Sequence, residues 1–154
     1  MRNPRTYLNR RDLLALGSGV ITISAMPLKS FAAEADLERA RRELFGVRPI
    51  QEGRVSVTLP PIAENGYSVP LSVIVDSPMT AADHVKRIAI LSPRNPLPVI
   101  AQYHFTPRSG RAAVDARIRM SGTQAIQAVA EMNDGTLWSG SMETVVTLAA
   151  CVLH

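Results

Sequence analysis

The 154-residue chain is predicted to be an all-β protein, folded as an antiparallel sandwich or barrel. Three observations predict this class. From residue 54 onward, short runs such as VPLSVIV (69–75) place apolar residues at every second position. Turn-forming stretches such as NDGT (133–136) separate these runs. Only one clearly helical segment precedes the runs, so strands are expected to make up most of the structure.

Residues 1–35 are expected to be an export signal that is removed. Arg10-Arg11 precede a weakly apolar stretch, 13–26, and small residues suited to a signal peptidase follow. The arginine pair resembles a twin-arginine signal, although Asn9 stands where Ser or Thr is usual. An ordinary secretory signal and a retained anchor are the alternatives. The apolar stretch is shorter than the ~20 residues of a membrane-spanning helix. The mature protein is therefore expected in the periplasm and off the membrane.

The high isoelectric point of the chain belongs mostly to this signal. The whole chain has a formal net charge of +4. Residues 36–154 retain 12 Lys+Arg and 11 Asp+Glu, a formal net charge of +1. The mature part therefore carries no basic excess that would indicate a nucleic-acid partner.

The segment 36–48 is expected to form the N-terminal helix. Leu37, Leu44 and Phe45 recur at helical spacing. Gly46 is a typical residue for a helix end, and Pro49 prevents continuation. The β-sandwich is then expected to occupy 49–148.

Six strands are expected from alternation of apolar and polar residues: RVSVTL (54–59), VPLSVIV (69–75), VKRIAIL (85–91), PVIAQYHF (98–105), AVDARIRM (113–120) and ETVVTL (143–148). A further segment, TQAIQAVAEM (123–132), also suits a helix. The Asp-Gly turn that follows it favours a hairpin, so this segment is interpreted as a strand.

No motif in the chain indicates a cofactor or a metal. The sequence has no G-x-S-x-G, no P-loop, no dinucleotide fingerprint and no closely spaced His/Cys set. The histidines, His84, His104 and His154, are scattered, and His104 is interpreted as a packed or half-exposed strand residue. Glu64 and Asp76 lie in separate loops with no second carboxylate to form an acid/base pair. No cofactor, metal or catalytic residue is therefore predicted.

Two turns are interpreted as structural. Asn65-Gly66 is expected to form a tight turn, and Asp76 or Ser77 to cap the chain before a proline. Met79, if exposed, would suit a contact surface.

Cys151 is the only cysteine, and it lies near the end of the printed sequence. A lone thiol in an exported chain suggests pairing outside the chain or a reactive group. Two interpretations stay open. Cys151 could be a small buried hydrophobe that extends the last strand. Alternatively, it could be a handle on a terminal arm, about 13–14 Å beyond a strand that ends near Thr147.

Taken together, the strands and turns resemble the SoxY family, the sulfur-carrier subunit of the Sox thiosulfate-oxidation system. The resemblance is based on LPPIAENGYSVPLSVIVDSPMT (59–80), NPLPVIAQYHFTP (95–107), ARIRMSGTQAIQAVAEMNDG (116–135) and the terminal VVTL-x-x-C.

The resemblance implies an immunoglobulin-like sandwich with a short N-terminal helix and a C-terminal arm, 149–154. It implies a heterodimer with a SoxZ-type subunit and a covalent attachment point for sulfur at Cys151. A c-type cytochrome complex, a sulfate-releasing hydrolase and a sulfane dehydrogenase would act on this arm in turn, and the chain itself would be no enzyme.

The arm departs from the family's pattern. The usual tail is Gly-Gly-Cys-Gly-Gly, whereas this chain has Ala149-Ala150-Cys151-Val152-Leu153-His154. These side chains stiffen and thicken an arm that glycines would leave slim. A paralogue that keeps the fold but carries nothing, with Cys151 merely packed, is therefore the alternative. A Cys-dependent hydrolase is disfavoured because no His or carboxylate is obviously placed to activate the thiol.

Overall fold

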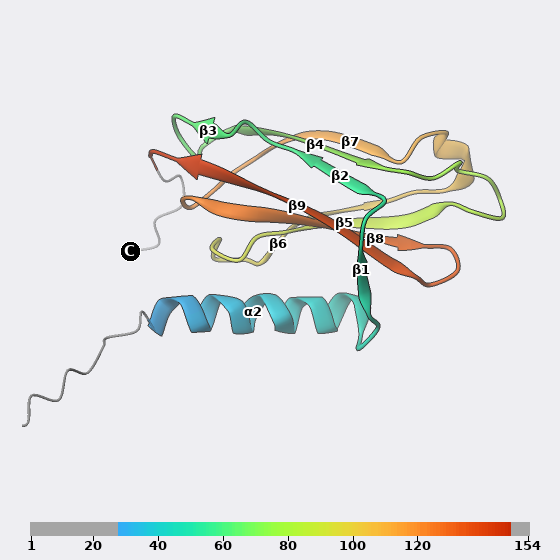
Figure 1. Cartoon of the computed structure of the whole chain (residues 1–154), viewed down its shortest axis with the longest axis horizontal. Coiled ribbons are helices and arrows are strands. Elements are labelled where there is room, and N and C mark those ends of the chain that lie inside the picture. The colour runs from blue at the N-terminus through green and yellow to red at the C-terminus, as the bar shows by residue number, and fades with distance from the viewer. Residues whose placement is uncertain (1–27, 149–154) are drawn as a thin grey trace, which may run out of the picture.

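The structure, a computed structural model, describes residues 28–148 and is a two-layer β-sandwich with a helix against one outer face (Figure 1). It confirms the predicted all-β class. The elements are α2 (Leu28–Phe45), β1 (Ile50–Glu52), β2 (Val55–Thr58), β3 (Ile62–Ala63), β4 (Val69–Val75), β5 (Val85–Leu91), β6 (Val99–His104), the 3-10 turn η1 (Pro107–Ser109), β7 (Ala113–Ile118), β8 (Gln124–Met132) and β9 (Leu137–Val146).

The larger sheet has the order β1-β9-β8-β5-β6, and the smaller sheet has the order β2-β4-β7. Most neighbouring strands are antiparallel, as predicted. Two short pairs are parallel instead, because β1 and β3 both lie along β9, one toward each of its ends. Between them the chain leaves β9 to form β2 of the other sheet. The β9 edge is therefore completed by two separate segments.

The core between the sheets comes from alternating side chains. In β4, for example, residues 69, 71, 73 and 75 are buried, as their period of two requires. Strand β8 buries residues on both faces because α2 covers its outer side. Leu37 and Phe45 of the helix pack there against Ala89, Leu91 and Val129.

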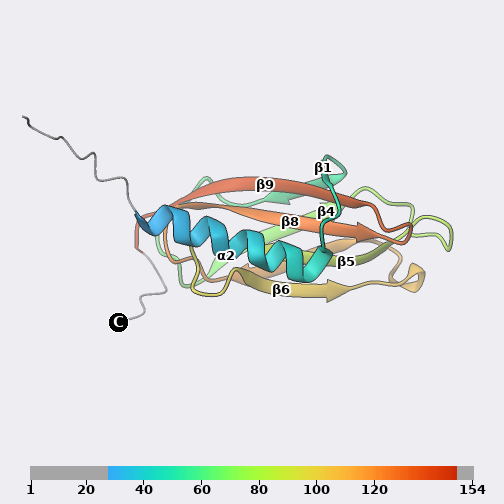
Figure 2. The ribbon, with the colours of Figure 1, turned by 90° about the horizontal axis from the view of Figure 1, so that it is seen from below.

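The helix lies across β8 and β5 on the outer face of the larger sheet (Figure 2). It spans Leu28–Phe45, whereas 36–48 was expected. Alanine-rich sequence upstream of residue 36 favours the longer helix. The helix ends at Phe45, because the next residue, Gly46, adopts a φ of 69° while its N–H donates to the Arg42 carbonyl at 2.8 Å. The signal boundary at residue 35 stays a prediction.

The segment 123–132 is a strand, β8, as interpreted. Gly135 has a φ of 86°, and the Met132 N–H donates to the Thr136 carbonyl at 2.9 Å, so a tight turn joins β8 to β9. Strands β1 and β3 and the first part of β9, residues 137–142, were not predicted. They are three, two and six residues long and carry no clean alternation.

Candidate functional site

Cys151, the predicted attachment point, lies outside the described residues, as does the rest of 149–154. The described chain ends at Leu148, three residues earlier. Three extended residues span at most about 10–11 Å. The structure therefore describes the segment that directly precedes 149–154, which is called the base, and this base is the candidate functional site.

One side of the base is held by the segment 61–66. The Val145 N–H donates to the Pro61 carbonyl at 3.0 Å, and the Thr147 N–H donates to the Ala63 carbonyl at 3.1 Å. The Gly66 N–H then donates to the Leu148 carbonyl at 2.7 Å. These bonds continue the β3–β9 pairing to the last described residue. The chain is thus tied to the sandwich up to Leu148.

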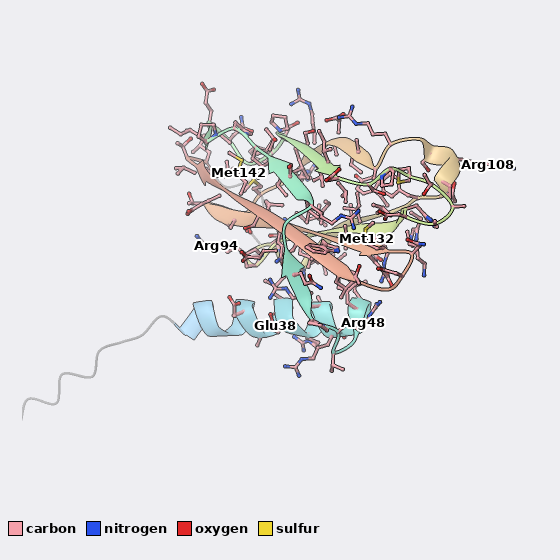
Figure 3. All side chains as sticks on the ribbon, turned by 45° about the vertical axis from the view of Figure 1, so that its right-hand side comes forward. Glu38, Arg48, Arg94, Arg108, Met132 and Met142 are labelled. Carbon is pink, nitrogen blue, oxygen red and sulfur yellow. The ribbon has the colours of Figure 1, made fainter. Side chains whose placement is uncertain are left out.

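The other side of the base is held by Thr123, at the start of β8. Its hydroxyl accepts the Val146 N–H at 3.0 Å, and its carbonyl accepts a guanidinium N–H of Arg94 at 2.7 Å. Figure 3 shows Arg94 and Met142 toward this end of the sandwich. The Met142 thioether approaches the Leu59 N–H at 3.2 Å. Both sheets therefore contribute contacts around the end of β9.

A buried polar cluster fixes the loop that carries Arg94. The Gln124 side-chain oxygen accepts the Ser92 hydroxyl at 2.6 Å and the Arg94 N–H at 3.1 Å. The Gln124 amide donates to Asn95 at 3.1 Å, and Asn95 accepts the Ser121 N–H at 3.0 Å. Each buried polar atom named here has a partner, so these hydrogen bonds hold the loop against the start of β8.

Glu64 and Asn65-Gly66 lie in this base, whereas the turn 76–80 lies at the opposite end of the sandwich, where the Asp76 N–H donates to the Arg54 carbonyl at 2.7 Å. Asn65 accepts the Tyr67 N–H at 3.1 Å, which makes the tight turn expected at Asn65-Gly66. Glu64 is exposed, and its carbonyl accepts the Thr147 hydroxyl. Met79 is buried, at 5% exposed, so it offers no contact surface.

The two described histidines lie at the other end of the sandwich. His84 precedes β5, and its Nδ1 is 3.0 Å from the Thr80 carbonyl oxygen. His104 ends β6 as an exposed strand residue. Both border a groove of 560 Å³ with Arg87. Within residues 28–148, no three His, Cys, Asp or Glu side chains gather into a set that could hold a metal ion. His154 lies outside the described residues.

The clearest electrostatic effect is also remote from the base. Burial raises the pKa of Glu131, but hydrogen bonds and charges of Arg48 and Arg87 outweigh it, so the pKa lies below its ordinary value. The carboxylate oxygens lie 2.9 Å and 2.7 Å from the two guanidinium groups. Arg87 also donates to the Leu44 carbonyl at 2.7 Å. This cluster fastens the helix to the sheet.

The family model described as "Sulfur oxidation protein SoxY" matches residues 41–151. The chain belongs to the SoxY family. The match runs from the helix, through every strand, to Cys151 itself. Among curated proteins, none matches this chain.

Solved structures agree with this assignment. The sulfur carrier protein SoxY from Chlorobium limicola f thiosulfatophilum is 30% identical, with a TM-score of 0.66, over 77% of this chain and 97% of that one. A superoxide reductase (neelaredoxin) from Ignicoccus hospitalis is 19% identical, with a TM-score of 0.54, over 61% and 80% of the two chains. The latter likeness shows a shared sandwich fold alone.

The sequence pointed to Cys151 but not to the residues that hold its base. The two-residue β3 and the Thr123 hydroxyl both contact the end of β9, which is distant in the sequence, and no local sequence pattern predicts such contacts. The signal available was the IAENG stretch, the most specific part of the resemblance, which the structure places directly beside the end of β9. No described helix is long and apolar enough to cross a membrane.

Proposed function

We propose that the mature chain is a periplasmic sulfur-carrier subunit that holds thiosulfate-derived sulfur on Cys151. The observation that carries this proposal is that the family match ends at Cys151, three residues beyond a chain anchored as far as Leu148. The relative from Chlorobium is itself a sulfur carrier protein. A thiol that other proteins act on is well served by a short segment that follows a chain held to the sandwich by hydrogen bonds.

The chemistry requires an accessible thiolate. In the loading step, the Cys151 thiol loses its proton and its sulfur joins the outer sulfur of thiosulfate. Two electrons leave to a c-type cytochrome partner. A hydrolase partner then adds water and releases sulfate, which leaves a persulfide on Cys151. A dehydrogenase partner can oxidise the remaining outer sulfur. Thiolates serve as both nucleophile and leaving group in such exchanges.

The sandwich supports these steps by position rather than by catalysis. Each enzyme would act in its own pocket, so the sulfur species has to be bound to a segment that is narrow enough to enter that pocket. We propose a SoxZ-type subunit as the partner in a heterodimer and no cofactor of the chain's own.

A second candidate, a paralogue that carries nothing, is favoured by one observation. Val152 and Leu153 stand where glycines are usual in the family. Apolar side chains beside the thiol favour packing of the tail, and a packed thiol would be a poor nucleophile.

Intact-mass measurement separates the two candidates. Carrier protein isolated with its partner subunit from thiosulfate-oxidising cells should carry thiosulfonate or persulfide adducts, and Cys151→Ser should carry none. An unmodified thiol during turnover that also resists iodoacetamide in the folded state would overturn the carrier proposal.

Export is tested separately. Arg10-Arg11→Lys-Lys should keep the protein in the cytoplasm, whereas the matched control Arg5→Lys should reach the periplasm. Normal export of the double-lysine variant would exclude the twin-arginine route.

A further inference from the structure

Four large apolar side chains are exposed around the end of β9. Ile62 is 63% exposed, Tyr67 61%, Val145 46% and Leu148 65%. Ile62 and Val145 are direct partners in the parallel β3–β9 pair, so their side chains leave the same face. The Gly66–Leu148 hydrogen bond brings Leu148 to the residue before Tyr67. These four residues are called the root collar.

The collar is unusual within the described part of the chain. Its members account for four of the seven large hydrophobic side chains that are exposed there; the other three, Val47, Ile74 and Leu97, lie on three separate segments. Single exposed hydrophobic residues need no explanation, whereas a gathered group marks an interaction surface. The collar's neighbours on β3 and β9, Ala63 and Val146, are buried.

We propose that the root collar is the docking surface for the pocket rim of the enzymes that act on Cys151. This inference rests on the proposed function. Cys151 lies three residues beyond Leu148, so its sulfur can enter a pocket by only about 10 Å. An enzyme whose reacting groups lie at that depth has to bring its rim onto the surface around Leu148. The collar is that surface.

The chemistry of the collar specifies the rim. The segment 61–67 contains one charged residue, Glu64, and its remaining exposed side chains are mostly apolar or neutral. On β9, Glu143 is exposed on the same face as Val145, two residues away. The matching rim is therefore mainly apolar, and the encounter depends more on burial of hydrophobic area than on charge pairing. A single rim chemistry would let one carrier serve several enzymes in turn.

Ile62→Thr and Val145→Thr, singly and together, test the proposal. Threonine keeps the β-branched shape that strands favour, while it removes apolar area. Val47→Thr is the matched control, because Val47 is 96% exposed and lies beyond the end of α2. Tyr67→Ser is a further variant that alters no strand. All are assayed as heterodimers with the SoxZ-type subunit.

The readout is the rate of thiosulfate loading by the c-type cytochrome enzyme as the carrier concentration is varied. The double variant should raise KM for the carrier about tenfold with kcat nearly unchanged, and Tyr67→Ser should raise KM severalfold. Val47→Thr should match the wild type. The alkylation rate of Cys151 by iodoacetamide should be equal in all variants, since no enzyme is involved.

Unchanged KM in both the double variant and Tyr67→Ser would overturn the proposal. So would loss of the heterodimer on size-exclusion chromatography, because the collar would then be the subunit interface. If the wild-type chain itself takes no thiosulfate, the proposed function fails instead. If the wild type loads normally and the collar variants load with the same KM, only the docking surface is refuted and the proposed function stands.

Discussion

Gly140→Ala should destabilise the sandwich at a point where β9 of one sheet closely approaches β2 of the other. Gly140 lies in the middle of β9, between the stretches paired with β1 and β3. A Cβ added there would stand 2.1 Å from the carbonyl oxygen of Val55 and 3.0 Å from its carbonyl carbon. Val55 begins β2, where the chain passes from the β9 edge to the other sheet. Only a residue without a side chain permits this crossing.

The size of the effect follows from what has to move. Contacts of a Cβ below 3.0 Å are essentially never found, and the clashing atom is backbone, which cannot rotate away as a side chain would. The β2 backbone would have to shift by roughly 1 Å while it stays paired with β4. Overpacking of this kind costs about 3 kcal/mol, which lowers Tm by about 10 °C in a domain of this size.

Thermal unfolding followed by circular dichroism measures the shift. Ser141→Ala is the matched control, because Ser141 is the next residue of the same strand and is exposed. Its Tm should stay within about 2 °C of the wild type. If Gly140→Ala has the same Tm as Ser141→Ala, the close approach of β2 and β9 does not limit stability, and the steric argument is wrong.

Two further predictions concern polar groups. Glu131 has a lowered pKa in the folded state, so its pairing with Arg48 and Arg87 stabilises the fold above pH 4.5, and that contribution disappears as the pH falls through the folded-state value. Glu131→Gln should therefore lower Tm more at pH 7 than at pH 3, and an equal loss at both would contradict the charge argument. Gln124→Leu should cost about 2 kcal/mol in urea unfolding, because the Ser92 hydroxyl and a neighbouring backbone N–H lose their buried acceptor. A variant as stable as the wild type would show that water replaces that acceptor.

Much of the fold was predictable because it depends on neighbours in the chain. The expected strand 69–75 coincides with β4, whose alternate residues are buried. The Asp-Gly turn decided between helix and strand for β8, and Gly135 has the positive φ that such a turn needs. The helix was expected to begin eight residues too late, because residues up to 35 were assigned to the export signal.

The candidate site was predictable only in part. Cys151 was predicted as the attachment point from its place in the chain and from the family's pattern, and this stays a prediction because Cys151 lies outside the described residues. Its base was not, because β3 has two residues and its partner on β9 lies more than 80 positions away. Contacts between such distant segments leave no periodicity in either one. The exposed state of Ile62 and Val145 could not be foreseen for the same reason.

The sequence by itself determined the class of the fold and the positions of its main strands along the chain, since alternation and turn chemistry act over a few residues. It also gave the position of the single thiol in the chain. Only the tertiary structure decided which edge β1 and β3 complete, how closely β2 crosses β9 and which apolar side chains stay uncovered around Leu148. Those outcomes depend on which surfaces the other strands leave open once they have paired, and that is settled when the whole sandwich assembles.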